Sequence, residues 1–337
     1  MNPFPATNII IIFAIHCLLA FGCCIQEIQG LAASPSATNG GTSSKSTVVV
    51  YGPKSRELLL LVSKLAAKQP GRTASCICAP GTEDGCRRLM YGVDYANEGV
   101  DQPGKAKPIS NPEEMDDALQ RADSVVLVAT DEPVDGATLT TFLKYTNTKV
   151  LKKIVLLSKM GVTNNKNGGG FFGGGNRAWK ESEKALQKIA SDHHLDFSIV
   201  RAGVLKGGGP SVDNVGNSLH EESSLSKAYY NTILDVVEYK VTVAHDTFSL
   251  GADSTSVVAG DPHTMPNIMT QIGTKASFEP GLTDTNRCTA ASAVVASLSL
   301  PPLEISVGTA VGNELPTQEE WSTLLESILE INKNVVS

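Results

Sequence analysis

From residue 47 onward, the hydrophobic positions of the chain follow two alternating patterns. Short runs of β-branched and other apolar residues predict buried strands at 48–51, 74–79, 124–130, 153–158 and 197–200. Between these runs, segments such as 56–68 and 176–192 repeat their apolar residues with the spacing of an amphipathic helix. Strands and helices that alternate in this way predict a parallel sheet with helices on both faces, which is a doubly wound α/β fold.

The remaining elements have weaker patterns. A third strand is expected at 105–110, and the alternation loosens over 211–286, where an edge strand is expected at 236–242. The end of the chain regains its pattern and predicts a helix at 289–298, a strand at 304–309 and a final helix that opens at 316–320. No repeat or linker divides this body, so we expect one domain over 48–332 with a less regular C-terminal portion.

The first 47 residues have the composition of a targeting leader. Residues 1–30 resemble a signal peptide, because 8–25 are predominantly apolar and carry no charged side chain. Residues 31–47 contain five Ser, three Thr, one Lys and no acidic residue, which is typical of a transit peptide. Together they resemble the two-part leader of plastid proteins in algae with secondary plastids. This predicts a plastid location, a mature chain that begins within the second segment, and no stable membrane span after leader removal.

Other interpretations of the leader stay open. A plain secretory leader would place the protein outside the cell or in the lumen of the endomembrane system. A lipoprotein signal that ends at Cys23 and an uncleaved membrane anchor are further alternatives.

Charge and cysteine content narrow the classes of partner. Lys and Arg number 28 against 35 Asp and Glu, so the net charge is −7 and the phosphate backbone of a nucleic acid is not an expected partner.

Three cysteines lie in the leader, and the body holds four more, Cys76, Cys78, Cys86 and Cys288. No second cysteine pair follows at the spacing of a metal site, so we interpret these residues as buried free thiols and expect no bound metal.

Several short motifs carry a resemblance to a known family. Tyr51-Gly52 follows the first strand, Ser158 closes another, and Trp179-Lys180-Glu181-Ser182-Glu183 opens a helix. Together with Arg201-Ala202-Gly203, which closes a later strand, they resemble an atypical short-chain dehydrogenase/reductase, nearest to the plastid and cyanobacterial NmrA-like group. The resemblance spans about residues 47–331. It implies a Rossmann-like doubly wound sheet and NAD(P) as the cofactor, with NADP slightly favoured over NAD.

The same resemblance implies a cofactor site where the strands end. The residues that it assigns to this site are Gly52, Lys54, Ser55, Arg56, Ala129, Thr130, Ser158, Lys180, Arg201 and Gly203.

The loop after the first strand departs from the family pattern. The family has Gly-x-x-Gly-x-x-Gly, whereas this chain has Gly52-Pro53-Lys54-Ser55-Arg56-Glu57-Leu58, so only the first glycine is present. The missing glycines would let a pyrophosphate approach the helix N-terminus, and we expect Ser55 and Leu58 to hold it away. The positive charges of Lys54 and Arg56 could bind the phosphates in place of the missing backbone contacts. A loop that still binds a dinucleotide and a loop that only packs are both compatible with this sequence.

The catalytic residues of the family are incomplete. Ordinary members pair Tyr-x-x-x-Lys with a Ser on the preceding strand, and the tyrosine donates the proton. Here Ser158 and Lys180 match two of these catalytic positions, but Asn176 stands four residues before Lys180. Because an amide cannot donate a proton as a phenol does, ordinary carbonyl reduction lacks its acid.

Three functional hypotheses follow from these patterns. The preferred one is an NAD(P)-binding-like protein with weak or no redox chemistry that acts with protein partners in plastid regulation or assembly. The second is an NADPH-dependent oxidoreductase that acts on an unknown small molecule through Ser158, Lys180 and an unidentified proton donor. The third is a protein-interaction scaffold that binds no nucleotide.

Overall fold

The computed structural model describes residues 46–92, 102–130, 132–162, 174–206, 208, 223–226, 229, 255–259, 284–309, 315–317 and 319–326. The leader and the edge strand expected at 236–242 lie outside these residues. Within the described part, no helix combines the length and apolar character that a membrane span requires.

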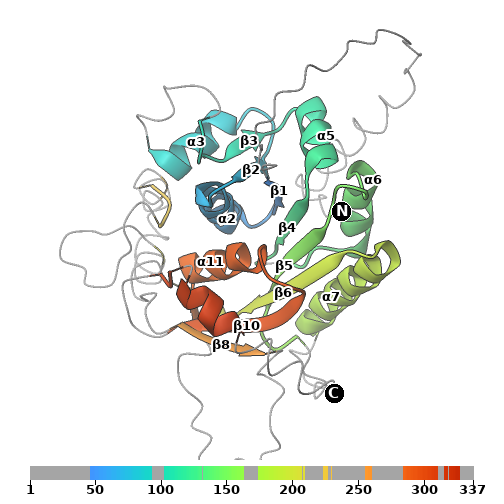
Figure 1. Cartoon of the computed structure of the whole chain (residues 1–337), viewed down its shortest axis with the longest axis vertical. Helices are drawn as coiled ribbons and strands as arrows, with labels where there is room; N and C mark the ends of the chain where they lie inside the picture. The colour runs from blue at the N-terminus through green and yellow to red at the C-terminus, as the bar shows by residue number, and fades with distance from the viewer. Residues whose placement is uncertain are drawn as a thin grey trace, which may run out of the picture.

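The described strands form one large sheet and one small sheet (Figure 1). The strands are β1 (Ser46–Tyr51), β2 (Arg72–Ile77), β3 (Lys107–Ile109), β4 (Ser124–Val128), β5 (Lys153–Lys159), β6 (Asp196–Ala202), β7 (Val204–Lys206), β8 (Thr255–Ala259), β9 (Asp284–Asn286) and β10 (Leu303–Thr309). The large sheet has the order β3-β2-β1-β4-β5-β6-β10-β8, in which all neighbours are parallel except β10 and β8. A parallel pair of β7 and β9 forms the small sheet.

Helices cover both faces of the large sheet (Figure 1). The labelled helices are α2 (Arg56–Lys68), α3 (Glu83–Tyr91), α5 (Pro112–Arg121), α6 (Gly136–Tyr145), α7 (Gly174–His193) and α11 (Arg287–Ser297). Helices α2, α3 and α11 pack on one face, and α5, α6 and α7 pack on the other. Successive side chains of a strand point to opposite faces, so Val48 and Val50 join the first core while Val49 joins the second.

Local sequence signals begin several of these helices. Asn111 accepts a hydrogen bond from the backbone N–H of Glu113, with Pro112 in the first helical turn, and Asp135 caps α6 through the N–H of Thr138. Thr317 and Glu320 make the predicted capping box, since the Thr317 N–H donates to the Glu320 carboxylate at 2.7 Å. The doubly wound fold predicted from the sequence is therefore confirmed, including the third strand.

The first strand begins earlier than the composition indicated. Ser46 and Thr47, which we assigned to the transit-like segment, pair in parallel with Arg72 and Thr73 as the first residues of β1. The Ser46 hydroxyl donates to the carboxylate of Asp123 at 2.9 Å. Because its hydroxyl has a hydrogen-bond partner in the protein, Ser46 is compatible with the start of a strand. Composition alone could not separate Ser46 from the Ser- and Thr-rich leader.

Candidate functional site

Two cavities lie side by side where the parallel strands end. The first, of about 440 Å³, lies between the ends of β1 and β2 and the helices α5 and α6. The second, of about 720 Å³, lies beyond the ends of β4, β5 and β6 and beside the first turn of α2. Lys54 and Arg56 line both cavities, so the loop after β1 stands between them. This place is the point where the strand order reverses, at which doubly wound sheets bind their ligands.

Gly52 lets this loop pass close to the neighbouring strand. A Cβ atom at Gly52 would lie 2.9 Å from both the Cβ and the carbonyl oxygen of Val128. The loop then turns directly into α2, because the N–H of Ser55 donates to the Gly52 carbonyl at 3.0 Å. The first glycine of the family pattern therefore has a packing role here, whether or not a ligand binds.

Ser55 and Leu58 take different roles from those we expected. The Ser55 hydroxyl forms a 2.7 Å hydrogen bond with the hydroxyl of Thr130 and makes no side-chain cap on α2. Leu58 is 1% exposed and packs in the core between α2 and the sheet. Leu58 therefore belongs mainly to helix packing, and replacing it by glycine would remove core side-chain contacts in addition to helix propensity. The uncapped first turn of α2 borders the second cavity through Glu57 and Leu58.

The charged side chains of the loop have protein partners. Lys54, which lines both cavities, forms an exposed ion pair with Glu132. The Arg287 Nε and the Glu57 carboxylate form a half-buried pair at 3.1 Å on the wall of the second cavity. An exposed pair is worth little free energy, so a phosphate could replace the carboxylate beside Lys54 at small cost.

Ser158 belongs to a buried polar network. Its hydroxyl donates to Glu183 at 2.6 Å, and the same carboxylate accepts from the Nε and Nη2 of Arg201 at 3.0 and 2.8 Å. Arg201 also donates to Glu304 at 2.8 Å and is 1% exposed. Burial alone would lower the pKa of Arg201, but Glu183 and then Glu304 outweigh it and raise that pKa. The Ser158 hydroxyl is therefore directed to a carboxylate within the protein, although Ser158 also lines the second cavity.

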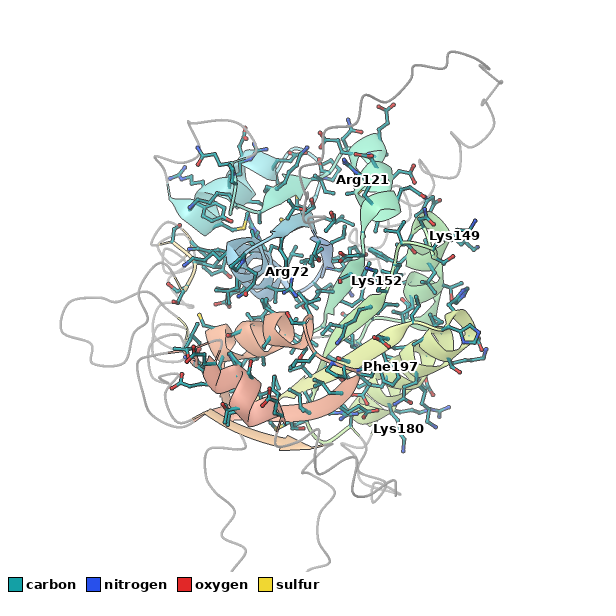
Figure 2. The ribbon with its side chains drawn as sticks, in the orientation of Figure 1. Arg72, Arg121, Lys149, Lys152, Lys180 and Phe197 are labelled. Carbon is teal, nitrogen blue, oxygen red and sulfur yellow. The ribbon has the colours of Figure 1, made fainter. Side chains whose placement is uncertain are left out.

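The structure brings most of the expected cofactor residues together. Those that line the second cavity are Lys54, Ser55, Arg56, Ala129, Thr130, Ser158 and Gly203, and Gly52 lines the first. Arg201 lies behind Ser158 in the buried network and lines neither cavity. Lys180 lies on α7, four residues beyond Asn176 as the sequence requires, and it too lines neither cavity (Figure 2).

Two cysteines lie on the wall of the first cavity. Cys78 directly follows β2, and Cys86 lies in α3 with its sulfur 3.9 Å from the hydroxyl of Thr82. The neighbouring Cys78 thiol, with smaller contributions from Thr82 and Arg56, lowers the pKa of Cys86 to about 6. The Cys78 thiol itself donates to the carbonyl oxygen of Ile109 at 3.5 Å, and its interaction with Cys86 is the main cause of a raised pKa at Cys78.

The other two described cysteines lie in the core. Burial raises the pKa of Cys76 to about 12 and also raises that of Cys288. All four thiols are free, but Cys78 is half-buried on a cavity wall, so the interpretation as buried thiols describes Cys76 and Cys288 better. Within the described residues, no group of His, Cys, Asp and Glu could hold a metal ion.

Sequence reasoning missed the carboxylates that complete the buried network. Glu183 follows Trp179 by one helical turn and precedes Leu186, so it occupies the apolar stripe of α7. A carboxylate in such a stripe indicates a buried cation nearby, and that signal was present in the sequence. Glu304 carries no comparable signal, because only the pairing of β10 with β6 places it beside Arg201.

No family model and no curated protein matches the chain. Among solved structures, it is similar to a short-chain dehydrogenase/reductase (wide type) from Veillonella parvula in complex with NADP, with 9% identity and a TM-score of 0.44 over 80% of this chain and 99% of that one. A putative NAD-dependent epimerase/dehydratase from Bacillus halodurans matches with 14% identity and a TM-score of 0.43 over 83% and 100%. Yeast methylglyoxal/isovaleraldehyde reductase complexed with NADPH matches with 8% identity and a TM-score of 0.40 over 85% and 99%.

The assignment of the fold rests on the strand order and not on these low similarities. The order β3-β2-β1-β4-β5-β6 is that of the dinucleotide-binding Rossmann sheet, and β10 extends it in parallel. The fold that the resemblance implied is thus confirmed: the chain has a Rossmann-like doubly wound architecture.

Proposed function

We propose that this protein binds a pyridine dinucleotide across the loop at residues 52–56, with its adenine end in the first cavity and its nicotinamide end in the second. The observation that carries the proposal is the position of the two cavities on either side of this loop, with Lys54 and Arg56 on the wall of each. The pyrophosphate would lie between the cavities, near both cations and the uncapped first turn of α2.

The walls of the first cavity favour NADP(H) over NAD(H). A flat base would meet apolar side chains there, among them Tyr51 and Phe142, whose rings lie 4.4 Å apart. In the NAD-binding form of this fold, an acidic residue about 20 residues beyond the glycine loop binds the ribose 2′-hydroxyl, whereas an arginine accommodates a 2′-phosphate. Here β2 is followed by Cys78 and Ala79, and Arg56 borders the same cavity.

The network around Ser158 supports binding with weak or no redox chemistry. Its hydroxyl donates to Glu183, and Asn176 offers no phenol where the family has its proton donor. We therefore propose that the dinucleotide acts as an effector and that the protein acts with protein partners in plastid regulation or assembly. The two-part leader supports the plastid location, and detection of the mature protein in isolated plastids would test that part.

One observation favours an NADPH-dependent oxidoreductase as the second candidate. The second cavity, of about 720 Å³, leaves room for a small molecule beside a nicotinamide. Oxidation of NADPH with a panel of carbonyl compounds, followed at the absorbance of the reduced nicotinamide, separates this candidate from the effector role.

Titration of the purified protein with NADPH and NADH, followed by nucleotide fluorescence, tests the binding proposal. We expect Lys54→Ala to weaken NADPH binding about two- to fivefold and to flatten its salt dependence, because one exposed charge is lost. Lys152→Ala is the matched control, since Lys152 is also exposed but immediately precedes β5, at the amino end of a strand whose carboxyl end borders the second cavity.

The other outcomes of this titration are equally informative. Tight NADPH binding that Lys54→Ala leaves unchanged would refute the role given to the side-chain charge and would move the oxidoreductase ahead. Failure of both nucleotides to bind would refute the proposal and leave the nucleotide-free scaffold.

A further inference from the structure

The first cavity contains two thiols that the proposed nucleotide binding does not require. Cys78 follows the end of β2, and Cys86 lies near the start of α3. Both line the cavity, although Cys86 as a whole is only 3% exposed. The cavity is therefore the route by which a reagent would approach Cys86.

The contacts of the pair give the two thiols different roles. The Cys78 thiol donates to the carbonyl oxygen of Ile109 at 3.5 Å, and the Thr82 hydroxyl lies 3.9 Å from the Cys86 sulfur. The cation of Arg56 favours a thiolate at Cys86, while the carboxylate of Glu83 opposes it. Glu83 is itself hydrogen-bonded to the Ser110 hydroxyl. A thiolate beside a second thiol is the arrangement that disulfide exchange requires.

We propose that Cys86 and Cys78 form a reversible dithiol–disulfide site, with Cys86 as the attacking thiol, Cys78 as the resolving thiol and a small disulfide as the oxidant. The Cys86 thiolate attacks one sulfur of the small disulfide, forms a mixed disulfide and expels a thiolate. Cys78 then loses its proton and attacks the Cys86 sulfur, which forms the Cys78–Cys86 bond and expels the second thiolate. The expelled groups take up the two protons, so the protein loses two electrons and the small disulfide is reduced to two thiols.

The oxidation state of the two thiols also controls nucleotide binding in the first cavity, an inference that rests on the proposed nucleotide binding. Cys78 occupies the position after β2 at which the fold contacts the ribose of a dinucleotide. A bound nucleotide would cover the thiols, and a disulfide there would reshape the wall that the ribose contacts. Oxidation and nucleotide binding therefore oppose each other.

The exchange is tested on the full chain with Cys17, Cys23 and Cys24 of the leader replaced by serine. Reduced protein is treated with one equivalent of dithiodipyridine. We expect two thiopyridone molecules released per chain, a mass loss of about 2 Da and a cross-linked Cys78–Cys86 peptide. Cys78→Ser should stop at a mixed disulfide on Cys86, and Cys86→Ser should react about tenfold more slowly or worse.

Two arginine variants separate the local electrostatics from general effects of mutation. Arg56→Gln should slow the reaction several-fold, whereas Arg88→Gln, an exposed arginine on the same helix as Cys86, should leave the rate unchanged. Equal rates in Cys86→Ser and the parent protein, or a disulfide that joins any other cysteines, would overturn the proposal.

The nucleotide arm uses NADP⁺, which cannot reduce the reagent. Saturating NADP⁺ should slow the thiol reaction at least severalfold, and the oxidised protein should bind it more weakly than the reduced protein. Binding of NADP⁺ without any effect on the thiol rate would overturn the opposition between them. If the reduced protein binds no nucleotide, the proposed function fails, while the disulfide result still decides the dithiol site.

Discussion

The two cavities beside the loop at 52–56 differ in how their polar side chains are used. In the second cavity, Ser55 bonds Thr130, Ser158 donates to Glu183, and Arg287 pairs with Glu57. The first cavity is mostly apolar, and its polar groups include two thiols and Arg56. A ligand that breaks the hydrogen bond of such a polar side chain must offset the free energy of the bond that is lost. The comparison teaches that the second cavity is lined by polar side chains held in structural pairs, whereas the first cavity presents mainly an apolar wall.

The largest expected effect concerns the buried network behind the second cavity. Arg201→Met leaves the Glu183 carboxylate buried without its cation, and we expect a loss of about 3–5 kcal/mol in the free energy of unfolding. Urea denaturation measures it. Arg177→Met is the matched control, because Arg177 pairs with Glu181 at the surface and its loss should leave the free energy of unfolding nearly unchanged. Similar losses in the two variants would contradict the structural role of this network.

The next effect concerns the wall between the two cavities. Gly52→Ala places a Cβ 2.9 Å from the side chain and backbone of Val128, so we expect a destabilisation of about 1–3 kcal/mol. Gly85→Ala, in α3, meets nothing within 4 Å and should instead stabilise by about 0.5–1 kcal/mol through helix propensity. Thermal unfolding compares the two, and a tolerated Gly52→Ala would show that the loop does not need this close approach.

A smaller effect depends on pH and belongs to the first cavity. Burial, and then the nearby Asp135, raise the pKa of Tyr51 to about 12. Between about pH 10 and 12 the unfolded chain releases this proton while the folded protein keeps it, so stability falls as pH rises. Relative to Tyr51→Phe, the wild type should therefore lose about 1–2 kcal/mol over this range, with a constant difference below about pH 9. Urea midpoints at both ends measure it, and a difference independent of pH would place the Tyr51 hydroxyl in water.

The smallest effect concerns the ion pair between Glu132 and Lys54, the lysine that lines both cavities. Glu132→Gln removes the carboxylate that pairs with Lys54, so the ammonium is left for the phosphates of a nucleotide. Since an exposed pair is worth at most about 1 kcal/mol, NADPH affinity should rise by up to about fivefold, while stability changes by less than about 1 kcal/mol. Asp116→Asn, which neutralises another acid on the first cavity, is the control for net charge. Equal gains in the two variants would point to general electrostatics rather than to this pair.

Much of the fold could be predicted from local sequence. Continuous apolar runs indicated β4 and β5, because both faces of these strands are buried. The apolar stripes of α2 and α7 indicated the side of each helix that packs against the sheet. The start of β1 was less certain, because Ser46 and Thr47 have the composition of the preceding leader. Helix α6 was missed, since its three threonines and two aromatic residues weaken the helical pattern.

The sequence by itself determined the alternation of the central buried strands with the amphipathic helices α2 and α7, the lack of two glycines after β1 and the absence of a tyrosine at residue 176. Only the tertiary structure decided that Ser158 donates to Glu183, that Glu304 joins Arg201, and that Cys78 and Cys86 line the same cavity. The reason is physical. The hydrophobic periodicity of a helix or strand depends only on residues within that element. The partner of a buried polar group depends instead on strand pairing and helix packing, which bring together residues far apart in the chain.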